Sequence, residues 1–123
     1  MRIVLAVWFF GHGVAHLPGF LVSWRLRSFP ELPYHTTILG NSVDVGSFGM
    51  RIIGAGWLLG TVTFVALAAA ALFRMPGWQD AAYVVLGFSL ILCILGWPAA
   101  RIGVASNIGA ALLLFAGRRW GWL

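Results

Sequence analysis

Charged residues and cysteines are scarce in this sequence of 123 residues. Only 9% of the residues are charged, whereas hydrophobic residues make up 61%. A soluble domain carries roughly 25% charged residues, so the charges available here are too few to cover a water-exposed surface. The composition therefore excludes a water-soluble globular domain and predicts a small integral membrane protein.

Cys93 is the only cysteine, and it lies in an apolar run. A single cysteine excludes an intramolecular disulfide and a CxxC metal or redox pair. It also excludes an extracellular module that depends on disulfides for its stability.

The few charges are almost all arginine. Eight arginines and no lysine stand against three acidic residues, which gives a net charge of +5. The arginines occur singly or in pairs at the ends of apolar runs, as is typical of membrane flanks, and not in the patch expected of a nucleic-acid-binding surface. We therefore expect the lipid bilayer as a partner and no nucleic acid.

Four apolar stretches are long enough to be considered as membrane spans, at about 20 residues per crossing. The stretch from 81 to 117 is too long for one crossing, and Trp97-Pro98 is the predicted point of reversal. The sequence thus predicts an all-α fold, a four-transmembrane-helix bundle forming one domain over residues 1–123. The expected spans are about 2–22, 49–73, 80–97 and 99–117.

One long polar loop, residues 24–48, separates the first two expected spans. Within it Gly40-Asn41, a turn-forming pair, stands between two β-prone runs and predicts a short β-hairpin that acts as a lid. The polar residues expected in this loop lid are Tyr34, His35, Thr36, Thr37 and Asp44.

Four spans would place both termini on one side of the membrane. If Arg51 and Arg101 belong to helices, the remaining arginines favour cytoplasmic termini in a bacterial inner membrane, although an antiparallel dimer of dual topology stays open. Small residues at Gly56-x-x-x-Gly60 and Ala105-x-x-x-Gly109 allow close helix contacts. We expect a homo-oligomer or a subunit of a larger membrane complex.

Five polar residues at membrane depth form the expected site. His12 lies near the centre of the first span, His16 follows one turn later, and Asn107 lies at a similar depth in the fourth span. An intramembrane ionisable residue usually finds a partner, so we predict a hydrogen bond between His12 and Asn107. Arg51 and Arg101 would share the leaflet of His16, which predicts a polar cup between the first, second and fourth spans. Arg101 and Asn107 are about 120° apart around their helix, so both would face the cup only if Arg101 bends inward.

Several functions fit such a cup. The preferred interpretation is a structural or accessory subunit without catalytic activity, in which these residues hold helices together. The alternative is a module that binds a quinone, a lipid head group or a small anion in the cup. His12 and His16 have helical spacing suited to a metal, with His35 as a third ligand. Haem held by His12 or His16 is less favoured, because axial pairs usually come from separate helices. A proton-coupled exporter is disfavoured, because no carboxylate lies within an expected span.

Three segments carry a resemblance. They are Gly-His-x-x-x-His-Leu-Pro-Gly-Phe (11–20), Pro-Tyr-His-Thr-Thr (33–37) and Gly-Trp-Pro-x-x-Arg-Ile-Gly (96–103). They resemble segments of uncharacterised small bacterial membrane proteins with four spans, distantly similar in architecture to the DoxX-like families. The resemblance implies the fold, and in some DoxX-like proteins an association with quinone-linked redox complexes, but it assigns no catalytic residue.

Overall fold

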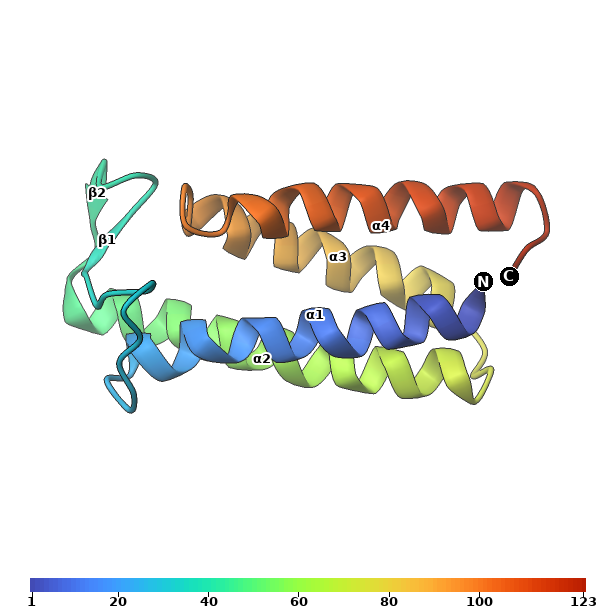
Figure 1. The fold of residues 1–123 in the computed structure, drawn as a ribbon, viewed down its shortest axis with the longest axis horizontal. Coiled ribbons are helices and arrows are strands. Elements are labelled where there is room, and N and C mark those ends of the chain that lie inside the picture. The colour runs from blue at the N-terminus through green and yellow to red at the C-terminus, as the bar shows by residue number, and fades with distance from the viewer.

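A computed structural model describes all residues from 1 to 123, as four helices and a small hairpin (Figure 1). The helices are α1 (Arg2–Ser23), α2 (Gly46–Leu72), α3 (Trp78–Leu95) and α4 (Arg101–Arg119). They run alternately up and down, so that both termini lie at one end of the bundle and the hairpin lies at the other. We call these the terminal end and the hairpin end.

Three of the helices, α1, α2 and α3, are long and apolar enough to cross a membrane. α4 is not among them, because its 19 residues include three arginines together with Asn107. The prediction of a helical protein with apolar candidate spans is confirmed. The turn predicted at Trp97-Pro98 lies in the connection between α3 and α4.

The predicted hairpin is confirmed. Strand β1 (Thr37–Ile38) pairs antiparallel with β2 (Val43–Asp44), and Thr37 lies opposite Asp44. Leu39, Gly40 and Asn41 between the strands all have positive φ angles, which a tight turn requires. Asp44 accepts a hydrogen bond of 2.9 Å from the Gly46 amide, and this bond and the Thr36 side chain hold the pKa of Asp44 below its usual range.

Two backbone hydrogen bonds attach the hairpin to the far side of the bundle. The Leu39 amide donates to the Leu95 carbonyl at 3.0 Å, and the Gly40 amide donates to the Trp97 carbonyl at 2.8 Å. The hairpin therefore spans the end of the bundle, from the α1 and α2 side to the end of α3.

The helices do not contact one another equally. α1 packs along the length of α2, and α3 packs against both α2 and α4, but α1 and α4 have few contacts with each other. Gly13 and Gly60 allow the close α1–α2 approach, since a Cβ at Gly13 would lie 2.8 Å from the Phe64 Cβ and one at Gly60 would lie 2.7 Å from the His16 ring. Gly56 faces Leu92 of α3, whereas Ala105 is exposed and a Cβ at Gly109 would meet no neighbouring atom within 4 Å.

The main hydrophobic core lies in the terminal half of the bundle. Its large members include Phe9 of α1, Phe64 of α2, Leu86 of α3 and Leu114 of α4, all buried. An ion pair of 2.6 Å between Arg118 and Asp80 joins α4 to α3 at this end. Dense packing in the terminal half contrasts with the hairpin half, where the helices enclose a cavity.

Candidate functional site

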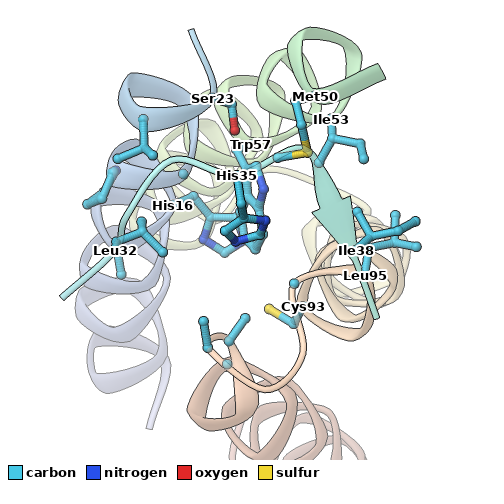
Figure 2. Close-up of a pocket in the computed structure, with 18 of the residues that line it drawn as sticks. His16, Ser23, Leu32, His35, Ile38, Met50, Ile53, Trp57, Cys93 and Leu95 are labelled. Atoms are coloured by element: carbon cyan, nitrogen blue, oxygen red, sulfur yellow. The ribbon is translucent and has the colours of Figure 1, made fainter. Parts of the chain in front are cut away.

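The cavity lies beneath the hairpin and has a volume of about 310 Å³. All four helices and the loop contribute to its lining, and more than half of the lining residues are hydrophobic. Figure 2 shows His16 and His35 extending toward its middle, with the Cys93 thiol facing them from the opposite side. Representative lining residues are Ala15, His16, Tyr34, His35, Trp57, Cys93, Ile102, Gly103 and Ser106.

A hydrogen-bonded cluster joins α1, α3 and α4 at the inner end of the cavity. The Ser89 hydroxyl lies 2.8 Å from Nε2 of His16, 3.3 Å from Nε2 of His12 and 2.9 Å from Nδ2 of Asn107. His16, Ser89 and Asn107 are buried, with 2%, 0% and 1% of their surfaces exposed. We call His12, His16, Ser89 and Asn107 the polar cluster.

Ser89 adds a third member to the predicted contact between His12 and Asn107. Its hydroxyl lies within hydrogen-bond distance of both side chains. Ser89 was hard to predict from the sequence, because a serine inside an apolar helix can also bond to its own backbone. One signal was present, since Ser89 lies near the middle of the third expected span, at the depth of His12 and Asn107.

Aromatic rings hold the two histidines in place. His12 stacks on Trp8 with ring centroids 4.5 Å apart and contacts the Phe64 ring at 4.9 Å. His16 packs against Trp57 at 5.1 Å. Because the rings and the Ser89 hydroxyl fix the imidazoles from several sides, the inner end of the cavity is a preformed polar site in an apolar wall.

The predicted cup is wrong in its arginines. Arg51 and Arg101 are exposed and do not line the cavity. The Arg51 backbone carbonyl accepts a hydrogen bond of 2.9 Å from the Trp24 indole, while Arg101 begins α4. The position of each arginine along its helix was predictable from the sequence. The direction of its side chain around the helix axis was not, and both side chains point away from the cavity.

The loop lid contributes only part of the residues expected. Tyr34, His35 and Thr37 line the cavity, whereas Thr36 and Asp44 are not among its lining residues. Thr37 donates to the Asn41 side chain at 2.6 Å and lies 3.3 Å from Nδ1 of His35. Tyr34 is covered by the guanidinium of Arg25, 4.2 Å from its ring centre.

The predicted metal site at His12 and His16 does not have the required geometry. No group of three or more His, Cys, Asp or Glu side chains is placed to hold a metal ion, and His35 does not complete a set. Both Nε2 atoms face Ser89, and Nδ1 of His16 faces the His12 carbonyl at 2.8 Å. Three of the four ring nitrogens are thus engaged within the protein, and Nδ1 of His12 alone does not make a metal site.

No known family model, no characterised protein and no solved structure matches the chain. The cavity and its polar cluster are therefore the features from which a function is assigned.

Proposed function

We propose that this chain is a four-span integral membrane protein that binds a small, uncharged, largely apolar molecule in the cavity beneath the hairpin. The observation that carries the proposal is the cavity of about 310 Å³, which has a mainly hydrophobic lining and a few convergent polar groups at its inner end. This combination is typical of small-molecule sites.

The charges around the cavity favour an uncharged ligand. None of its lining residues is an arginine or a carboxylate, so an anion or a phosphate head group would find no counter-charge there. Burying an unpaired charge in such surroundings is strongly unfavourable. Among the ligands considered from the sequence, the lining favours an uncharged ring compound of the quinone type over a lipid head group, a small anion or a metal ion.

The arrangement of the helices favours a ligand that arrives from the lipid. α1 and α4 both line the cavity, and few of their backbone positions lie close together, so we place the route of entry between these two helices. Toward the hairpin end, the hairpin is attached to Leu95 and Trp97 by backbone hydrogen bonds. A membrane-dissolved molecule would approach through the bilayer and between α1 and α4.

A bulky side chain that fills the cavity should abolish ligand binding. Ser106 lines the cavity from α4, whereas its neighbour Ala105 is exposed and outside the lining, which gives a matched pair of positions. We expect native mass spectrometry of gently purified wild-type protein to detect a small non-covalent adduct. Ser106→Phe should lose this adduct and Ala105→Phe should keep it. Absence of any adduct from the wild-type protein, or equal retention by both variants, would contradict the proposal.

The fourth span is supported by the arrangement of α4. This helix lies antiparallel to α3 with Arg101 at one end and Arg118 and Arg119 at the other, where arginines reach the membrane interfaces. Reporter fusions at both termini of the chain should therefore report the same side, and a fusion at Gly40 the opposite side. A C-terminal reporter on the side of Gly40 would show that α4 does not cross.

A role as an accessory subunit remains the second candidate, and one observation favours it. Ala105 of α4 is exposed, Gly109 is partly exposed, and a Cβ at Gly109 would meet no neighbouring atom within 4 Å. Such a small-residue face suits close contact with another helix. Homo-oligomerisation, a bacterial inner membrane, cytoplasmic termini and the DoxX-like resemblance stay predictions.

A further inference from the structure

The hydrogen atoms of the polar cluster can be assigned from their partners. A carbonyl oxygen only accepts, so Nδ1 of His16 carries the hydrogen and donates to the His12 carbonyl at 2.8 Å. In an uncharged imidazole Nε2 then holds a lone pair, and the Ser89 hydroxyl, 2.8 Å away, donates to it. The uncharged form is the appropriate one, because all three acidic residues of the chain are exposed and none lines the cavity.

Ser89 has only one hydrogen, and His16 uses it. The Ser89 oxygen can then accept two hydrogen bonds, which come from Nδ2 of Asn107 at 2.9 Å and from Nε2 of His12 at 3.3 Å. The second N–H of the Asn107 amide donates to the Gly103 carbonyl at 2.9 Å, which fixes the orientation of the amide. Every N–H and O–H donor of the polar cluster is thereby used.

Within the polar cluster, only hydrogen-bond acceptors remain free. Nδ1 of His12 has no partner in the structure, and His12 lines the cavity. The Asn107 oxygen is buried without a partner as well. Given the proposed function, on which this inference rests, we propose that the bound molecule carries a hydrogen-bond donor, a hydroxyl group on an apolar ring or chain, and donates it to Nδ1 of His12.

Trp57 and Ser106 also carry hydrogen-bond donors and line the cavity, but a ligand with only an acceptor, such as a ketone, a quinone carbonyl or an ether, would break the cluster if it were bound against His12. It would need a hydrogen on Nδ1 of His12, so that Nε2 of that ring would become an acceptor facing Ser89. Ser89 would then have to supply its one hydrogen to both histidines. One buried hydrogen bond would be lost, which makes the site selective for phenols and alcohols.

Two matched probes test this selectivity. Para-hexylphenol carries a hydroxyl donor, whereas para-pentylanisole has the same number of non-hydrogen atoms and only an ether acceptor. Binding of both is measured by equilibrium dialysis to the whole protein in phosphatidylcholine nanodiscs, with protein-free nanodiscs correcting for partition into lipid. We expect the wild-type protein to bind the phenol about tenfold more tightly than the ether, as one neutral hydrogen bond provides.

A variant then identifies the acceptor. His12→Phe keeps a ring against Trp8 but removes Nδ1, so the preference for the phenol should fall to about one while the ether binds as before. A wild-type preference near one would overturn the inference and leave the proposed function standing. An unchanged preference in His12→Phe would overturn the role of His12. Failure of both probes to bind above protein-free nanodiscs would overturn the proposed function together with the inference. The wild-type comparison decides the ligand class even if His12→Phe does not fold.

Discussion

Replacing Ser89 with alanine is expected to lower the free energy of unfolding by about 3 kcal/mol, because it removes a hydrogen-bond partner from buried polar groups on two helices, α1 and α4. Nε2 of His16 would lose its hydrogen-bond donor, and Nδ2 of Asn107 would lose one of its acceptors. Nε2 of His12 would lose its hydrogen bond to the Ser89 hydroxyl. The hydroxyl is completely buried, so bulk water cannot replace it directly.

The measurement for Ser89→Ala is unfolding of the purified protein by sodium dodecyl sulfate in mixed micelles, followed by circular dichroism. Ser106→Ala is the matched control, since Ser106 lines the cavity, is only partly buried and is not part of the polar cluster. We expect this control to change the unfolding free energy by less than about 0.5 kcal/mol. Equal effects of the two substitutions would show that the cluster does not hold the helices together.

Substituting alanine for Gly13 is the second change with a large expected effect. A Cβ at this position would lie 2.8 Å from the Phe64 Cβ and 3.2 Å from the Thr61 carbonyl oxygen. A carbonyl oxygen and a Cβ atom cannot move out of the way by a change of side-chain rotamer. α1 would therefore have to move away from α2. We expect a loss of about 2 kcal/mol, as is usual for overpacking a close contact.

Gly11 provides the control for Gly13, because a Cβ there would meet nothing within 4 Å. Gly11→Ala should leave stability unchanged or raise it by about 1 kcal/mol, since alanine favours the helix more than glycine does. The same unfolding assay compares the two variants. If Gly13→Ala were as stable as Gly11→Ala, the close approach of α1 and α2 would not exist in the folded protein.

The helices and the hairpin were predictable because they depend on local features of the sequence. The lengths of the apolar runs indicated four helices, the long uncharged stretch after residue 81 required a reversal at Trp97-Pro98, and Gly40-Asn41 indicated the turn of the hairpin. The boundaries moved by two or three residues, with α2 beginning at Gly46 and α4 at Arg101. Helix ends depend on capping and packing, which apolar patterns do not define well.

The site was only partly predictable. Position along each helix placed His12, His16 and Asn107 at one level of the bundle, and the Ser89 hydroxyl contacts all three there. The direction of each side chain around its helix axis determined which of the other expected residues face the interior. Asn107 is 1% exposed, whereas Arg101, about 120° away on the same helix, is exposed. The cavity itself depends on α1 packing against α2 and not against α4, and no residue pattern specified that choice.

The central claim, that the cavity beneath the hairpin takes up a small neutral molecule from the membrane, is tested most directly by photo-crosslinking. A para-alkylphenol with a diazirine in its chain is added to membrane vesicles containing the protein, and the labelled residues are identified by peptide mass spectrometry. We expect labels on cavity residues such as Ala15, Trp57 and Cys93, and their loss in Ser106→Phe but not in Ala105→Phe. Labels confined to outward-facing side chains such as Val4 and Val84, or equal labelling of both variants, would contradict it.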